Sequence, residues 1–182
     1  FKPSSFAQSF SSKGIETKTT SVLPTNCSVV IMAGGIGSRL EPFTSILPKP
    51  LVPVQGKPII DHIIENFMEY GIKDFYISIK YKARIMRAYF EEMELDRNII
   101  FIEEDTPLGT AGGLSLLPKG IADPIFVTNC DVILSMDYQE CYDFHLDGKF
   151  AMTIVAAVKK YRIPYGSCEL DVDGSLLKIN EY

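Results

Sequence analysis

Short apolar runs and helical patterns alternate along this chain from Ser28 onward, and this alternation limits its possible folds more than any other feature. The first apolar run is Ser28–Met32. After Pro58, apolar residues recur every three or four positions, at Ile59, Ile60, Ile63, Ile64, Phe67 and Met68. Strands that alternate with helices imply βαβ units. We therefore expect a three-layer α/β fold with a mostly parallel sheet.

The other elements follow from the same patterns. We expect strands at 75–79, 99–103, 125–128 and 150–158, and helices at 83–93, 110–117 and 136–145. Asp173-Gly174 lies between two short runs, 169–172 and 176–180, which is a strong signal for a β-hairpin. We expect this hairpin to add antiparallel strands at one edge and so to make the sheet mixed.

The two ends of the chain differ from its middle. Residues 1–25 are rich in Ser, Thr and Lys, so we expect a polar linker or arm there and one domain over 26–182. The chain has no initiator Met and stops at Tyr182. We expect that both ends were cut from a longer protein and that the C-terminal part of the domain is missing. These 182 residues alone should then be inactive and prone to self-association.

Composition excludes several classes of function. The chain carries 18 basic and 23 acidic residues, a net charge of -5, which disfavours nucleic acid as a partner but not a small phosphorylated ligand. The apolar run at 151–158 is too short to span a membrane. The four cysteines form no Cys-x-x-Cys pair, so we expect no zinc site, no disulfide framework and a cytoplasmic location.

Two neighbouring segments could bind phosphate. Ala33-Gly34-Gly35-Ile36-Gly37 follows the first predicted strand, and backbone N–H groups of such a loop can cradle phosphate oxygens. Prolines surround Lys49 and restrict its freedom, so its ammonium would be held beside that loop. The alternative is a tight turn carrying an exposed Arg39, followed by a stiff surface loop with a solvated lysine.

Two further strand ends carry unusual residues. Ligands of parallel α/β sheets bind beyond the carboxyl ends of the strands. After the strand at 99–103, a Gly-Thr-Ala-Gly turn at 109–112 opens a predicted helix, whose N–H groups could face a ligand or simply be capped. Asp131 follows the strand at 125–128 and is a suitable hard-oxygen ligand for Mg²⁺, or else the cap of a turn.

One long run carries a family resemblance. AGGIGSRLEPFTSILPKPLVPVQGKPII, residues 33–60, resembles the signature of the sugar-1-phosphate nucleotidyltransferases. That signature reads Ala-Gly-Gly-x-Gly-x-Arg-Leu, then Pro-x-Thr, then Pro-Lys-Pro-Leu-x-Pro, and each position is filled at the right spacing. The resemblance continues from Ser28 to the end of the chain and implies a nucleotide-binding, Rossmann-like sheet.

The resemblance also implies roles for particular residues. Arg39 would hold the triphosphate and stabilise the leaving pyrophosphate, and Lys49 would lie at the reacting phosphates. Asp131 would bind Mg²⁺, and Gly166 and Glu181 would face the sugar. The residues implied to line the nucleotide are Ala33, Gly34, Gly35, Gly37, Pro107, Gly109, Thr110, Ala111 and Gly112.

The implied reaction transfers a nucleoside monophosphate from a nucleoside triphosphate to a hexose or hexosamine 1-phosphate and releases pyrophosphate. Residues 107–112 are similar to the mannose-1-phosphate guanylyltransferase type, which favours GTP over dTTP. Cys130 stands where the family usually has Gly, which resembles a subgroup that often follows a pair of regulatory CBS domains. We also expect a homo-oligomer. The second metal carboxylate and the second phosphate-binding lysine would lie beyond Tyr182.

Two alternatives stay open at this point. One is a non-catalytic regulator that binds a nucleotide or sugar phosphate with the same fold. The other is nucleotidyl transfer to a phosphorylated acceptor that is not a sugar. Covalent catalysis by Cys130 is disfavoured because no base lies at a recognisable spacing from it. His62 and His145 each lie alone in a predicted helix, which is more typical of structural or surface residues than of catalytic ones.

Overall fold

The computed structural model describes residues 22–24, 27–93, 96–106, 108–121, 123–158 and 166–180. It divides into two compact units, with the boundary after Gly148, and each unit is described here by itself. No helix within these described ranges is long and apolar enough to cross a membrane. The linker expected at 1–25 lies almost wholly outside them.

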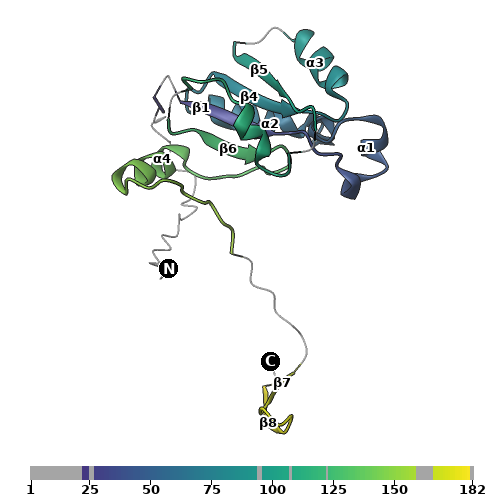
Figure 1. The fold of residues 1–182 in the computed structure, drawn as a ribbon, viewed down its shortest axis with the longest axis vertical. Helices are drawn as coiled ribbons and strands as arrows, with labels where there is room; N and C mark the ends of the chain where they lie inside the picture. The colour runs from purple at the N-terminus through teal and green to yellow at the C-terminus, as the bar shows by residue number, and fades with distance from the viewer. Residues whose placement is uncertain are drawn as a thin grey trace. The chain divides into compact units, whose positions relative to one another are not determined.

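The first unit is built on a sheet of four parallel strands (Figure 1). Its strands are β1 (Ser28–Met32), β4 (Asp74–Ile79), β5 (Asn98–Glu103) and β6 (Phe126–Asn129), and their order is β5-β4-β1-β6. The register pairs Ile31 with both Ile77 and Thr128, so the carboxyl ends of the strands lie at one edge. The predicted strands at 28–32, 75–79, 99–103 and 125–128 are therefore confirmed to within one residue.

Helices lie between or after these strands in the sequence. The three longer helices are α2 (Ile59–Met68), α3 (Ala83–Glu91) and α4 (Tyr138–Asp147). Helix α2 begins directly after Pro58, as predicted, and Gly71 beyond its end adopts a φ of 85° that suits glycine. Asp137 caps the N-terminus of α4, and its Oδ1 accepts hydrogen bonds from the backbone N–H groups of Gln139 and Glu140.

The core lies between the sheet and these helices. Register partners in a parallel sheet point to the same face, so one face carries Val29, Ile31, Phe75, Ile77 and Phe101. This face packs against buried side chains of the helices: Ile60, Ile63, Ile64, Phe67, Met86, Phe90 and Tyr138. Burial of this apolar surface is the main force that holds the unit together.

A short 3-10 helix, η3 (Gly112–Leu116), contacts the opposite face of the sheet. A Cβ added to its Gly113 would lie 3.1 Å from Met32 Cε and 3.1 Å from Ser78 Oγ. Glycine at position 113 therefore allows η3 to approach the carboxyl ends of β1 and β4. The helix expected at 110–117 is shorter and tighter than predicted.

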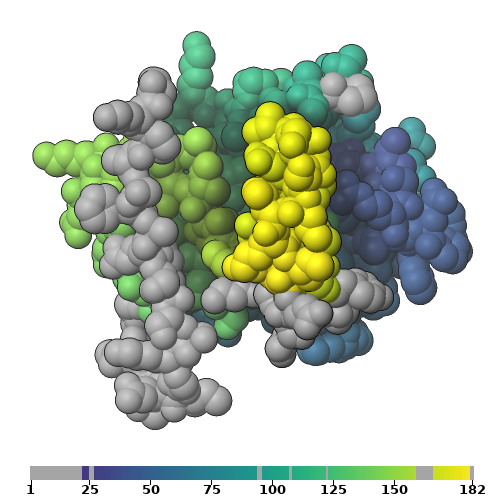
Figure 2. Space-filling view, turned by 90° about the horizontal axis from the view of Figure 1, so that it is seen from below, coloured from purple at the N-terminus to yellow at the C-terminus, as the bar shows by residue number. Residues whose placement is uncertain are grey.

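Shorter elements lie between β1 and α2. They are η1 (Ser38–Leu40), α1 (Phe43–Ile46), η2 (Lys49–Leu51), and the antiparallel pair of β2 (Pro53–Val54) and β3 (Lys57–Pro58). Helix α1 lies at the surface of the first unit, blue in both views (Figures 1 and 2), and its Phe43 and Ile46 are exposed. Prolines hold this region in turns, so no longer helix forms here.

The second unit contains the predicted hairpin. It consists of β7 (Ser167–Leu170) and β8 (Leu176–Asn180), joined by a turn in which Gly174 has a φ of 87°. Among the described residues the two strands pair only with each other. The four strands of the central sheet are all parallel, and the addition of the hairpin at an edge of that sheet stays a prediction.

The prediction of a strand at 150–158 is wrong. These residues form no strand in the described chain, and Met152, Ile154 and Val158 are exposed. The apolar, β-branched composition of this run is typical of strands. A strand also requires a partner for its backbone groups, and none of the described strands pairs with this run.

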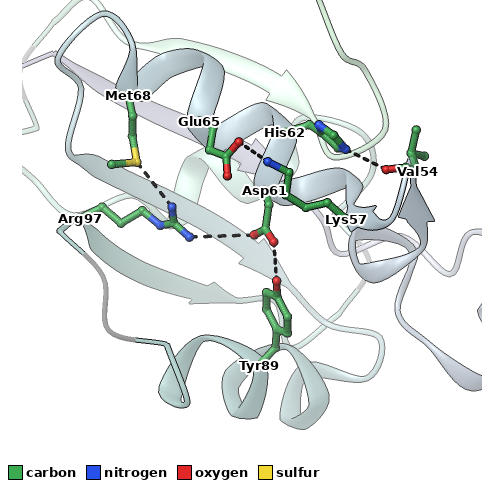
Figure 3. Close-up of polar contacts among 8 residues, drawn as sticks. All are labelled: Val54, Lys57, Asp61, His62, Glu65, Met68, Tyr89 and Arg97. Atoms are coloured by element: carbon green, nitrogen blue, oxygen red, sulfur yellow. Dashed lines mark hydrogen bonds and ion pairs between the residues drawn. The ribbon is translucent and has the colours of Figure 1, made fainter.

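A buried polar cluster ties α2, α3 and the start of β5 together (Figure 3). Asp61 of α2 is buried, and its Oδ2 accepts a hydrogen bond from the Tyr89 hydroxyl of α3. Arg97 Nη2 lies 4.0 Å from Asp61 Oδ1, and both side chains are less than a tenth exposed. Burial raises the pKa of Tyr89, and the hydrogen bond to Asp61 and the charge of Asp61 raise it further.

Replacing Asp61 tests this cluster. Asp61→Ala should lower the free energy of unfolding by about 3 kcal/mol, because Arg97 loses its buried counter-charge. Asp96→Ala is the matched control, since Asp96 pairs with Lys73 at the surface and should cost about 0.5 kcal/mol or less. Chemical denaturation measures both values. Equal losses in the two variants would contradict a structural role for the buried cluster.

Candidate functional site

The first unit has a cavity of about 1050 Å³ at the carboxyl edge of its sheet. It is lined by residues from the segments that follow β1, β4, β5 and β6. Among them are most of the residues predicted from the sequence: Gly34, Gly35, Gly37, Arg39, Lys49, Gly109, Thr110 and Asp131. The structure thus brings together segments about 100 residues apart in the sequence.

The other predicted residues are not among the described residues that line this cavity. Ala33 is buried at the end of β1, where its N–H donates to the carbonyl of Ser78, and it does not line the cavity. Ala111 and Gly112 are at the start of η3 and also do not line it. Gly166 precedes β7 in the second unit. Pro107 and Glu181 lie outside the described residues.

The glycine-rich loop is closely packed at one position and open at another. Gly37 has a φ of 73°, and its carbonyl accepts a hydrogen bond from Thr44 Oγ1 at 3.0 Å. A Cβ at Gly37 would lie 3.0 Å from Lys49 Cβ and 3.0 Å from Thr44 Cγ2. A Cβ at Gly35 would meet no atom within 4 Å. The loop therefore packs directly against Lys49 at Gly37, while Gly35 leaves its backbone open.

Lys49 and Asp131 form an ion pair in the cavity. Lys49 Nζ lies 2.5 Å from Asp131 Oδ2, although the two residues follow different strands. Lys49 begins η2 between two buried prolines, Pro48 and Pro50, which restrict its backbone. Both charged side chains keep part of their surface exposed, so a ligand can reach them. A fixed cation and a carboxylate in contact can bind a phosphate group and a metal ion side by side.

Arg39 adds a further positive charge to this side of the cavity. It lies in η1, immediately after the glycine-rich loop, and its side chain is exposed at the cavity wall. An exposed guanidinium can pair with phosphate oxygens through two parallel hydrogen bonds.

Asp131 is the residue that could hold a divalent metal. No group of three or more His, Cys, Asp or Glu side chains is placed to hold a metal ion in the described part of the chain. Mg²⁺ is commonly bound by one or two carboxylates together with substrate phosphates, rather than by a full protein cage. A single carboxylate beside a phosphate-binding lysine fits that pattern.

Cys130 lines the cavity but is a poor nucleophile. Burial raises the pKa of its thiol to about 11, an effect that the nearby Lys49 ammonium opposes. The thiol is therefore protonated at neutral pH, whereas the thiolate is the reactive form. His62 and His145 do not line the cavity, and a ring nitrogen of His62 lies 2.9 Å from the carbonyl oxygen of Val54. No nucleophilic role is therefore assigned to Cys130.

Glu104 is a site residue that the sequence reasoning did not select. It is buried at the end of β5 and lines the cavity. Its Oε1 accepts a hydrogen bond from Ser78 Oγ, and its Oε2 accepts one from the backbone N–H of Leu108 at 3.3 Å. A Cβ at Gly34 would lie only 3.0 Å from Oε1. Strand alternation carries the signal: Glu103 shares the face of Phe101 and pairs with Arg87 of α3, so Glu104 points to the opposite face, beside η3 and the cavity.

Comparison with known proteins identifies the family. Residues 28–181 match the family described as nucleotidyl transferase, and the chain belongs to this family. It is 38% identical over 149 residues to a mannose-1-phosphate guanyltransferase of Debaryomyces hansenii. The matched region covers 79% of this chain and 41% of that protein. A probable mannose-1-phosphate guanylyltransferase of Oryza sativa is 40% identical over 122 residues, covering 64% and 34%. The chain spans well under half the length of these relatives.

Solved structures agree with this assignment. HddC from Yersinia pseudotuberculosis complexed with GMP-PN superposes with a TM-score of 0.58 and 28% identity, covering 85% of this chain and 69% of that one. A putative glucose-1-phosphate thymidylyltransferase from Bacillus anthracis gives a TM-score of 0.59 and 25% identity, covering 68% and 51%. The expected Rossmann-like α/β fold is confirmed.

Two glycine substitutions test the packing of the loop. Gly37→Ala should destabilise the protein by about 1–2 kcal/mol, because alanine disfavours a φ of 73° and its Cβ would press on Lys49. Gly35→Ala is the control and should change stability by less than about 0.5 kcal/mol. Equal thermal stability of the two variants would contradict the close contact between Gly37 and Lys49.

Proposed function

We propose that this chain carries the nucleotide-binding part of an Mg²⁺-dependent sugar-1-phosphate nucleotidyltransferase. The reaction transfers a nucleoside monophosphate, GMP in preference, from its triphosphate to a hexose or hexosamine 1-phosphate and releases pyrophosphate. The observation that carries this proposal is the contact of Lys49 with Asp131 in a cavity that also contains the glycine-rich loop and Arg39.

The charges at the cavity suit this reaction. The sugar phosphate oxygen attacks the α-phosphorus of the triphosphate, and both partners are anions that repel one another. The Lys49 ammonium neutralises the phosphates as they come together, and Arg39 holds the departing pyrophosphate. A phosphate oxygen is already a nucleophile at neutral pH, so no general base is needed.

Asp131 is the protein ligand proposed for Mg²⁺. Bound there, Mg²⁺ would neutralise charge on the triphosphate oxygens. The carboxylate's part is to hold the ion beside Lys49, while the backbone of the loop at Gly34 and Gly35 binds the phosphates.

The two substrates are assigned to different parts of the chain. The base is proposed to lie against residues 107–112, of which Gly109 and Thr110 line the cavity. The preference for GTP is supported by the guanyltransferases among the relatives. Gly166 and Glu181 are proposed to bind the sugar.

The wider organisation of the protein is also a proposal. It comprises the linker at 1–25, a catalytic domain that begins at 26 and includes 182, a cytoplasmic location, a homo-oligomer and CBS domains upstream. The match of residues 28–181 to the family supports the position of the domain.

Pyrophosphate release by the complete gene product tests the proposed reaction. The assay combines a panel of triphosphates with hexose, hexosamine, polyol and choline phosphates, in the presence of Mg²⁺. GTP with a hexose or hexosamine 1-phosphate should be the best pair. Faster release with a polyol or choline phosphate would identify a different acceptor. Binding of the same ligands without any release would identify a regulator instead of an enzyme.

Three substitutions test the assigned roles. Arg39→Ala, Lys49→Ala and Asp131→Asn should each lower kcat/KM on the order of 10²-fold or more, because each removes a charge aimed at the reacting phosphates. Lys57→Ala is the matched control, since Lys57 pairs with Glu65 of α2 outside the cavity lining and its loss should change the rate less than about twofold. If one of these variants kept near-normal turnover, the residue that it replaces would not have the proposed role.

A further inference from the structure

The turn between β4 and α3 lines the cavity, and the proposed reaction gives it no task. It consists of Lys80, Tyr81 and Lys82, which follow the buried end of β4. Each lysine ammonium donates a hydrogen bond to a backbone carbonyl oxygen, Lys80 to that of Asp105 and Lys82 to that of Thr44. These two carbonyls belong to different segments around the site. The turn therefore bridges parts of the cavity that are far apart in the sequence.

Lys82 is bonded to the phosphate-binding side. Its Nζ donates a hydrogen bond to the backbone carbonyl of Thr44 at 2.9 Å. Thr44 is buried, and its hydroxyl donates in turn to the carbonyl of Gly37 at 3.0 Å. Gly37 packs against the side chain of Lys49. A continuous series of contacts thus leads from Lys82 to the glycine-rich loop and to Lys49.

Lys80 is bonded to the opposite side. Its Nζ donates to the backbone carbonyl of Asp105 at 2.7 Å and lies 3.4 Å from that of Glu104. The Glu104 side chain accepts from the backbone N–H of Leu108, directly before Gly109. Lys80 therefore holds the residues that precede the segment to which the nucleobase is assigned.

The backbone of the turn is held in an uncommon conformation. Lys82 has a φ of 56°, in the left-handed region that residues with a Cβ rarely adopt. Such a conformation persists where the surroundings determine it, and it is more frequent at functional sites. The Lys82 ammonium also lies 5.1 Å from the centre of the Tyr81 ring, which adds a cation–π contact inside the turn.

We infer that this turn is a positioning element that sets the separation between the phosphate-binding loop and the base-binding segment. Lys82 positions the loop through Thr44, and Lys80 positions the segment through Asp105. The inference rests on the proposed function, because that function assigns the triphosphate to one side and the base to the other. It adds two residues to which the reaction itself gives no role.

Binding measurements on Lys80→Met and Lys82→Met in the complete gene product test the inference. Methionine keeps most of the apolar stem and removes the donor. The probes are guanosine, GMP and GTP. Lys80→Met should lower the affinity for all three ligands by a similar factor, roughly 10-fold, because the base site is displaced. Lys82→Met should leave the affinity for guanosine unchanged and lower the affinity for GTP roughly 10-fold. Lys73→Met, at a surface pair with Asp96, is the control and should change none of them.

A third variant separates positioning from direct contact with phosphate. Thr44→Val removes the hydroxyl that bonds to Gly37 and changes no charge. If Lys82 acts through Thr44, the losses of GTP affinity in Lys82→Met and Thr44→Val should not add in the double variant, because both changes release the same contact with Gly37. If the Lys82 ammonium binds phosphate itself, the two losses should add, and the inference for Lys82 is wrong.

The remaining outcomes are distinguishable. Wild-type protein that binds no triphosphate would overturn the proposed function and, with it, this inference. Wild-type binding with both lysine variants equal to Lys73→Met would overturn the inference alone. Equal losses for all three probes in both variants, together with a lower Tm, would show that the turn only stabilises the fold.

Discussion

The common carboxyl edge of four parallel strands is the constraint on which the rest of this structure depends. Strand β1 lies between β4 and β6, and its first four residues, Ser28 to Ile31, are buried on both faces of the sheet. This buried strand fixes where the glycine-rich loop leaves the sheet. Because its neighbours are parallel, their following segments leave at the same edge. The cavity, its cations and its carboxylates all result from that arrangement.

An ion pair in the cavity joins two of these segments. Lys49 from the segment after β1 contacts Asp131 from the segment after β6. In the proposed reaction the same two groups face the reacting phosphates and the metal ion, so the pair must separate or share its charge as substrates bind. Buried Glu104 has a different part, since it is bonded to Ser78 and Leu108 and packs against Gly34. It holds the walls of the cavity in place.

Local patterns predict much of this structure. Strand β1 and helix α2 lie at the residues predicted, because their apolar spacing agrees with the surface that each one buries. The sequence could also predict the loop glycines, Lys49 and Asp131 as candidate site residues, because their residue types and their positions after predicted strands suit phosphate and metal binding. Lys80 and Lys82 could not, because their importance depends on β4 lying next to β1 and β5. The run at 150–158 has the composition of a strand, but pairing is a tertiary property that composition does not encode.

The central claim is that this cavity brings a sugar phosphate to the α-phosphorus of a triphosphate. Label transfer tests it most directly. The complete gene product is incubated with Mg²⁺, a hexose or hexosamine 1-phosphate, and GTP labelled with ³²P at either the α or the γ position. The account predicts that α label enters a phosphatase-resistant sugar nucleotide, while γ label is released as pyrophosphate. Release of γ label as inorganic phosphate, with no α label in a sugar nucleotide, would contradict it.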